Sequence, residues 1–291
     1  MLIGLQIISG LVSASILFLL ASGLSLMFGV CRVLNLAHGT FFMLAAYLTF
    51  AGTNLLHESG VSFWLMLLLA PLVLAGIGAA LELLVFRKLY GKDILVQLLP
   101  TIAIIFILAD VIRFVWGLES KTVPFPSGLP PAIEIFDVIF PSYYAVIVGA
   151  GVVIAVGLWA VVYRTRWGTL VRAIAQDRDM SAALGINETA IYTGVFAVAA
   201  WLAGTAGVLS SPLAGAALGS DLEAVINAFV VVVVGGLTSI PGALLAAILI
   251  GMVQSFGILV IPQFAMAFVF GLMALVLILR PHGLLGRKEV G

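Results

Sequence analysis

Long apolar runs separated by short polar segments make up most of the chain. A helix needs about 20 mostly apolar residues to cross the hydrocarbon core of a bilayer. Eight runs of about this length each predict a membrane-spanning helix: 3–30, 36–56, 62–86, 94–116, 142–163, 191–211, 243–261 and 264–280. A ninth run, 224–236, is short and predicts a short or broken span. The pattern predicts an all-α polytopic membrane protein.

The composition agrees with a membrane protein rather than a soluble one. Of the 291 residues, 63% are hydrophobic and 9% are charged, whereas a soluble domain is about 45–50% apolar and about 25% charged. The formal net charge is zero, so nothing indicates binding of nucleic acid. We therefore expect one transmembrane domain over residues 1–291, in contact with membrane lipid. The first run lacks the basic start of a cleavable signal peptide and is expected to remain as a span.

Basic residues gather on one side of the predicted spans. Segments 87–93 and 164–190 and the C-terminal tail hold three, four and three of them, and Arg32 adds one, which makes 11 of the chain's 13. Because Lys and Arg near span ends stay on the cytoplasmic side, the C-terminus is expected inside and the N-terminus outside. The polar loop 117–141 is then external.

Parity of the crossings constrains the short run. Segment 164–190 and the C-terminal tail are both basic, so an even number of crossings must join them. The run 224–236 therefore counts as a crossing. The alternative is that 224–242 re-enters the membrane and that one later span is misassigned.

No motif for catalysis or nucleotide binding occurs in the sequence. It lacks G-x-x-x-x-G-K-[ST], H-E-x-x-H and G-x-S-x-G. His38, His57 and His282 are too scattered to indicate a metal site. The chain is therefore expected not to be an enzyme and to hold neither a cofactor nor a metal.

Segment 164–190, RTRWGTLVRAIAQDRDMSAALGINETA, has the pattern of two short helices. Leu170 and Ile174 recur at helical spacing. Asp179 is placed to cap a second helix, and Gly185 is placed to end it. Two such helices would form a cytoplasmic knob suited to a groove on a partner. The alternative is a solvated loop whose arginines only follow the charge bias.

Four stretches of the chain resemble the permease subunits of bacterial ABC importers for branched-chain, or hydrophobic, amino acids. They are NLAHG at 35–39, RAIAQDRDMSAALGIN at 172–187, VVVVGGLTSIPGALLAAILIG at 231–251 and RPHGLLGR at 280–287. The chain resembles the smaller of that family's two permease types, which has no extended N-terminal region.

The resemblance implies a set of partners and a location. It implies a second permease subunit, usually a different chain, two cytoplasmic ATPase subunits that hold ATP and magnesium, and a periplasmic solute-binding protein. It implies a multi-pass protein of the bacterial inner membrane that carries branched-chain amino acids or a related small amphipathic solute. Coupling to the ATPases would involve Arg172, Ala173, Ala175, Asp177, Ala182, Ala183, Leu184 and Gly185.

A stand-alone secondary transporter or channel for a small neutral solute is the alternative function. Such a protein would need a deep unpaired carboxylate for ion coupling, or a symmetric filter. Neither is apparent in the sequence.

Two groups of polar and small residues interrupt the apolar runs and are candidates for the pathway or its gate: Asn35, His38 and Gly39, and Gly235, Gly236, Ser239, Pro241 and Gly242. Non-helical backbone at membrane depth is tolerated only where protein buries it or where it lines a cavity. If the second break lies deep in the membrane, it is a pathway or gate element. If it lies near the surface, it is only a tight cytoplasmic turn. The first group is either a helix cap with a histidine bonded to a neighbouring helix, or lies beside the pathway.

Ionisable residues inside apolar runs need partners, because each costs about 2.5–3.5 kcal/mol on insertion scales. Glu82 is expected to form an ion pair with Arg87 or Lys88. Asp221 and Glu223 belong either to a solvated loop or to a docking contact.

Overall fold

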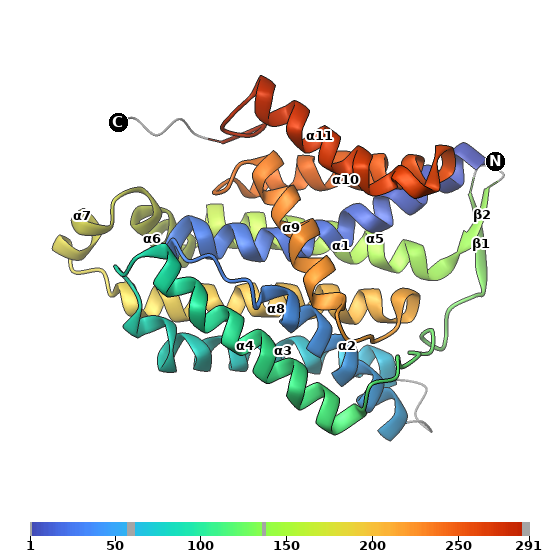
Figure 1. Ribbon diagram of the computed structural model, residues 1–291, viewed down its shortest axis with the longest axis horizontal. Coiled ribbons are helices and arrows are strands. Elements are labelled where there is room, and N and C mark those ends of the chain that lie inside the picture. Colours follow the sequence, from blue (N-terminus) through green and yellow to red (C-terminus); the bar gives the residue numbers. More distant parts are fainter. Residues whose placement is uncertain (1, 57–61, 136–137, 287–291) are drawn as a thin grey trace.

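The computed structural model describes residues 2–56, 62–135 and 138–286 and shows a bundle of long helices (Figure 1). The long helices are α1 (Leu2–Cys31), α3 (Ser62–Leu84), α4 (Ile94–Trp116), α5 (Ser142–Arg164), α8 (Glu188–Ala214), α10 (Ile240–Val260) and α11 (Ala265–Leu279). The shorter ones are α2 (His38–Leu55), α6 (Arg166–Gln176), α7 (Arg178–Ala183) and α9 (Ser220–Gly235), with the 3-10 helices η1 (Phe86–Lys88) and η2 (Pro262–Phe264). The strands β1 (Ala132–Ile135) and β2 (Val138–Pro141) form an antiparallel hairpin.

Seven helical segments of the described residues are long and apolar enough to cross a membrane: Leu2–Cys31, Ser62–Lys88, Leu95–Trp116, Ser142–Arg164, Glu188–Ala214, Ile240–Val260 and Pro262–Leu279. They correspond to seven of the eight predicted spans, which confirms the all-α polytopic fold.

The helices α2 and α9 fall outside that set. The run predicted as a span at 36–56 forms α2, an 18-residue helix that carries His38 and Asn54 among its apolar residues. The run at 224–236 lies in α9, whose 16 residues measure about 24 Å at 1.5 Å per residue. This is shorter than the hydrocarbon core of about 30 Å, as predicted for a short span. Figure 1 shows α9 running steeply across the neighbouring long helices.

The two ends of the bundle differ in what they present. The N-terminus and the β1–β2 hairpin lie at one end, and α6, α7 and the C-terminal segment lie at the other (Figure 1). Phe86 of η1 belongs to the same buried cluster as Val171 and Ile174 of α6, so the basic segments share one end. This is the arrangement that the positive-inside rule assigns to the cytoplasm.

Helix α8 is the most enclosed of the seven apolar segments, and small residues allow its neighbours to come close. A Cβ atom added at Gly207 would collide with the Phe42 carbonyl of α2 and approach Ala45 Cβ to 2.8 Å. Close backbone approach at small residues is the usual way in which membrane helices pack. The α2–α8 contact therefore depends on glycine at position 207.

Substitution of Gly207 by Ala should destabilise the protein by about 1–3 kcal/mol, since the added methyl group overpacks the α2–α8 contact. Thermal unfolding in detergent would measure this as a lower midpoint. Gly149→Ala in α5 is the matched control, because among the described residues nothing outside the helix's own backbone and the adjacent residues lies within 4 Å of a Cβ there. Equal midpoints for the two variants would contradict the packing argument.

Candidate functional site

Segment 164–190 folds into two short helices at the end of the bundle, as predicted (Figure 1). Asp177 joins them: it follows the last residue of α6, and its side chain accepts a hydrogen bond from the Met180 N–H of α7 at 2.9 Å. The prediction that Asp179 caps the second helix is therefore wrong. The extended backbone lies at Asp177 (φ −151°, ψ 107°), so Asp179 is already inside the first turn.

Gly185 ends α7, as its position in the sequence predicted. Its φ of 78° lies in the left-handed region, where glycine is favoured. The Gly185 N–H donates to the Ala182 carbonyl at 2.9 Å, and the Ile186 N–H donates to the Ser181 carbonyl at 3.1 Å. These bonds satisfy carbonyls that the end of the helix would otherwise leave free.

Helix α6 packs its apolar face onto the bundle. Val171 and Ile174 are buried in a cluster with residues near the ends of α1 and α8. Arg172 turns back toward α5: it donates to the Val162 carbonyl, and its guanidinium lies 5.3 Å from the centre of the Tyr163 ring. Arg172 therefore fixes the corner between α5 and α6, while Ala173 and Ala175 are half-buried.

An exposed, mostly apolar surface forms at the tip of the segment. It consists of Met180, Ala182, Ala183, Leu184 and Gly185, here called the knob. The side chain of Leu184 is 74% exposed and that of Met180 is 58% exposed. The tip of the segment therefore presents exposed apolar side chains at this end of the bundle.

The knob is fastened to α8 by an ion pair. Arg178 Nε donates to Glu188 Oε2 at 2.7 Å, and the guanidinium lies 5.6 Å from the centre of the Tyr192 ring. Partial burial lowers the pKa of Arg178, but the hydrogen bond to Glu188 and the nearby negative charges outweigh it, and the pKa lies above its ordinary value. Arg178 therefore stays charged. Asn187 caps α8 by accepting a hydrogen bond from the Ala190 N–H at 3.2 Å.

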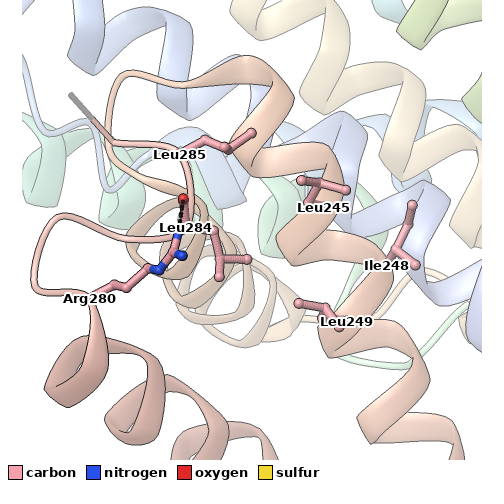
Figure 2. Close-up of a pocket in the computed structure, with 6 residues that line it drawn as sticks. All are labelled: Leu245, Ile248, Leu249, Arg280, Leu284 and Leu285. Atoms are coloured by element: carbon pink, nitrogen blue, oxygen red, sulfur yellow. Dashed lines mark hydrogen bonds between the residues drawn. The ribbon is translucent and has the colours of Figure 1, made fainter.

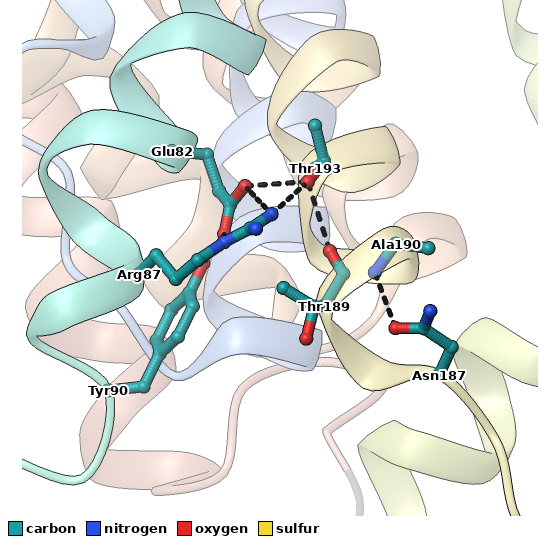
Figure 3. Close-up of polar contacts among 7 residues, drawn as sticks. All are labelled: Glu82, Arg87, Tyr90, Asn187, Thr189, Ala190 and Thr193. Atoms are coloured by element: carbon teal, nitrogen blue, oxygen red, sulfur yellow. Dashed lines mark hydrogen bonds and ion pairs between the residues drawn. The ribbon is translucent and has the colours of Figure 1, made fainter.

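A buried carboxylate ties α8 to α3 nearby (Figure 3). Glu82 is fully buried and pairs with Arg87, with 3.0 Å between Oε2 and Nη2, which confirms the predicted ion pair. Thr193 of α8 donates to the same oxygen at 2.6 Å, and the Tyr90 hydroxyl donates to Oε1 at 3.3 Å. No pattern in the sequence indicates a role for Thr193, because it lies 111 positions from Glu82.

The segment between α1 and α2 runs from the end of α1 back into the interior of the bundle. After Cys31 it runs without helical structure to His38, where α2 begins (Figure 1). The His38 Nε2–H donates to the Leu20 carbonyl at 3.0 Å, and the ring is completely buried. Leu20 precedes Cys31 by 11 residues, which is about 16 Å along a helix. Helix α2 thus begins beside the middle of α1.

The polar residues of this stretch stabilise its backbone. Asn35 is buried, and its Oδ1 accepts a hydrogen bond from the Ala37 N–H at 3.1 Å, in the turn that leads into α2. The predicted bond from the histidine to a neighbouring helix is present. Gly23 of α1 makes room for it, because a Cβ there would lie 2.8 Å from His38 Cε1.

The first turns of α2 and α9 meet at this depth. Gly39 packs directly on the Asp221 carbonyl, where a Cβ atom would collide. The Thr40 hydroxyl donates to Asp221 Oδ2 at 3.2 Å. Asp221 is buried, so it belongs neither to a solvated loop nor to an exposed docking contact, whereas Glu223 is exposed. A carboxylate in the first turn is favoured by the helix dipole of α9.

The second break lies nearer the end of the bundle. Helix α9 ends at Gly235, Gly236 turns the chain at φ 104°, and Ser239 caps α10 by accepting from the Gly242 N–H at 3.1 Å. Pro241 lies in the first turn of α10.

Two contacts fix the depth of this turn and show what covers it. Ser25, six residues before the end of α1, donates to the Leu237 carbonyl at 3.1 Å. The turn therefore lies about 9 Å from the end of α1, shallower than His38. The C-terminal segment covers it: the Leu284 and Leu285 N–H groups donate to the carbonyls of Val234 and Gly235 at 2.8 and 3.1 Å.

The structure thus separates the two groups predicted for the pathway. In the first group Gly39 lies against the first turn of α9 while His38 lies against α1, and the second group follows from the last residue of α9 into α10. Helix α9 joins them. A role of either group in the pathway or its gate stays a prediction.

Known proteins resemble this chain over most of its length. Residues 6–277 match the family model described as the permease component of a branched-chain amino acid transport system. The chain belongs to this permease family. It is 31% identical to the high-affinity branched-chain amino acid transport system permease protein BraD of Pseudomonas aeruginosa, over 98% of this chain and 96% of that protein.

Further relatives distinguish the two permease types of the family. The permease is 27% identical to LivH of Escherichia coli K12, over 98% of this chain and 96% of LivH. It is 28% identical to LivM of Salmonella typhimurium, but that match covers only 68% of LivM. The smaller permease type is thus the one that this chain matches over nearly the whole length of its relatives. No solved structure matches the permease.

The Glu82–Thr193 bond can be measured by a double-mutant cycle in this permease. Glu82→Gln and Thr193→Val should show a coupling free energy of unfolding of about 0.5–3 kcal/mol, because the first replaces the charged acceptor of the bond by a neutral amide and the second removes its donor. Thr205→Val is the control on the same helix, since the Thr205 hydroxyl donates to the Trp201 carbonyl of α8 itself. Its effect should add to that of Glu82→Gln within about 0.5 kcal/mol. Additivity for Thr193→Val as well would contradict the bond.

Proposed function

We propose that this permease forms part of the pathway of an ATP-driven importer in the bacterial inner membrane. The proposed cargo is a branched-chain amino acid or a related small amphipathic solute. Membership of the family and the names of its relatives support a role in branched-chain amino acid transport. The observation that carries the coupling to ATP is the knob, an exposed apolar tip on a rigidly attached pair of helices.

The proposed assembly contains several other chains. A second permease subunit of the LivM type would complete the pathway, which the match to LivM supports. Two ATPase subunits would bind ATP and magnesium and receive the knob at the basic end of the bundle. A periplasmic binding protein would deliver solute at the opposite end, where the β1–β2 hairpin lies.

The contacts of α8 suggest how movement would pass from the ATPases into the membrane. Displacement of the knob would pull on α8 through the Arg178–Glu188 ion pair. Helix α8 contacts α2 closely at Gly207, and α2 contacts the first turn of α9 at Gly39. In this proposal, closure of the ATPases shifts α8, and the α2–α9 contact at mid-depth changes with it.

Transport in proteoliposomes tests the proposal directly. The permease reconstituted with its second permease, ATPases and binding protein should take up labelled leucine only when ATP is present. Omission of the ATPases should abolish uptake. Uptake by the permease alone would instead support a stand-alone transporter or channel and would overturn the proposal.

Replacement of Leu184 by Asp should weaken ATPase binding at least 10-fold, because a charge at the centre of the knob would be buried without a partner in the interface. Copurification of the ATPases and ATP-dependent uptake measure this. Leu118→Asp is the matched control: its side chain is 71% exposed, close to the 74% of Leu184, and it follows the far end of α4. Unchanged copurification with Leu184→Asp would count against the knob as the docking surface.

A further inference from the structure

A cavity of about 510 Å³ lies between α10 and the C-terminal segment (Figure 2). Leu245, Ile248 and Leu249 line it from α10, and Arg280, Leu284 and Leu285 line it from the segment that follows α11. Five of these six residues are apolar. The sixth, Arg280, is a permanent cation.

Arg280 comes directly after the last residue of the apolar segment Pro262–Leu279. A basic residue at that point lies at the level of the lipid headgroups. Its Nη1 donates to the Leu284 carbonyl at 3.2 Å, and no carboxylate pairs with it within residues 2–56, 62–135 and 138–286. Its charge is therefore left for a ligand.

The apolar wall reaches from this level into the hydrocarbon. Leu245 and Leu249 lie five and nine residues beyond the first residue of α10, or about 8 and 14 Å along the helix. Both side chains are more than two-fifths exposed. The cavity thus offers a cation at headgroup depth and leucines at the depth of acyl chains.

We propose that this cavity binds one anionic phospholipid, with the phosphate on Arg280 and an acyl chain along Leu245, Ile248 and Leu249. Basic pockets on the cytoplasmic side of membrane helices are suited to anionic headgroups. A free phosphate would leave the apolar wall uncovered, and in a zwitterionic lipid the cation of the headgroup itself would offset the phosphate that pairs with the guanidinium.

A bound lipid would also stabilise the turn between α9 and α10. Leu284 and Leu285 line the cavity and, through their N–H groups, hold the last carbonyls of α9. Lipid binding should therefore strengthen the attachment of the C-terminal segment to that turn. This inference depends on the membrane location of the chain and not on its transport function.

The test uses the full-length chain, with the subunits that co-purify with it, in nanodiscs of phosphatidylglycerol or of phosphatidylcholine. Native mass spectrometry after extraction should find one retained phosphatidylglycerol and less retained phosphatidylcholine. Arg280→Gln should reduce retention roughly 5-fold, since a basic residue near the surface contributes on that scale. Arg280→Lys should retain the lipid, and Leu249→Trp, which fills the apolar part, should lose it.

Arg113→Gln is the control, because Arg113 lies near the far end of α4 and pairs with Asp110 at 3.2 Å; it should leave retention unchanged. Thermal unfolding in detergent verifies that each variant is folded. Equal retention by wild type, Arg280→Gln and Leu249→Trp would overturn the proposal, as would equal retention of the two lipids. A photo-crosslinking residue at position 249 that labels a protein subunit rather than lipid would also overturn it.

Discussion

Enclosure of the non-helical backbone between Cys31 and His38 is the constraint on which the centre of the bundle depends. Backbone groups without helical hydrogen bonds cannot face lipid, yet this stretch runs about 16 Å inward along α1. Asn35 bonds one of its N–H groups, and His38 anchors the start of α2 on the Leu20 carbonyl. Val33, Asn35 and Ala37 are all buried, so protein surrounds the stretch.

Burial of this stretch accounts for the length and the direction of the helices around it. Helix α2 is short because its first turn lies inside the bundle rather than at its edge. Helix α9 crosses the long helices steeply, and its first turn covers the beginning of α2 through Gly39 and Thr40. The other end of α9 is closed by the C-terminal segment. Two interruptions that look alike in sequence thus differ in depth and in what satisfies their backbone.

Local pattern was enough to predict most of the fold. Seven of the predicted spans, the two helices of segment 164–190 and Gly185 as the end of α7 follow from length, periodicity and turn chemistry. The cap at Asp177 was missed because Asp177 and Asp179 are both suitable residue types, and only the backbone angles distinguish them. Thr193 and Thr40 were missed because their partners, Glu82 and Asp221, are more than 100 positions away.

The sequence alone does not determine how deep in the bundle each of the two breaks lies. The packing of the helices determines it. Asn35 and Ser239 both occur at breaks in apolar runs, and each is next to residues compatible with a cap. Only the contacts with Leu20 and Ser25 of α1 show that the first break is deep and the second shallow. Because α9 connects the two, its last turn contacts the C-terminal segment and its first turn contacts α2 at mid-depth. The short helix α9 is therefore the element whose two ends contact the segment at the basic end of the bundle and the start of α2 at its centre.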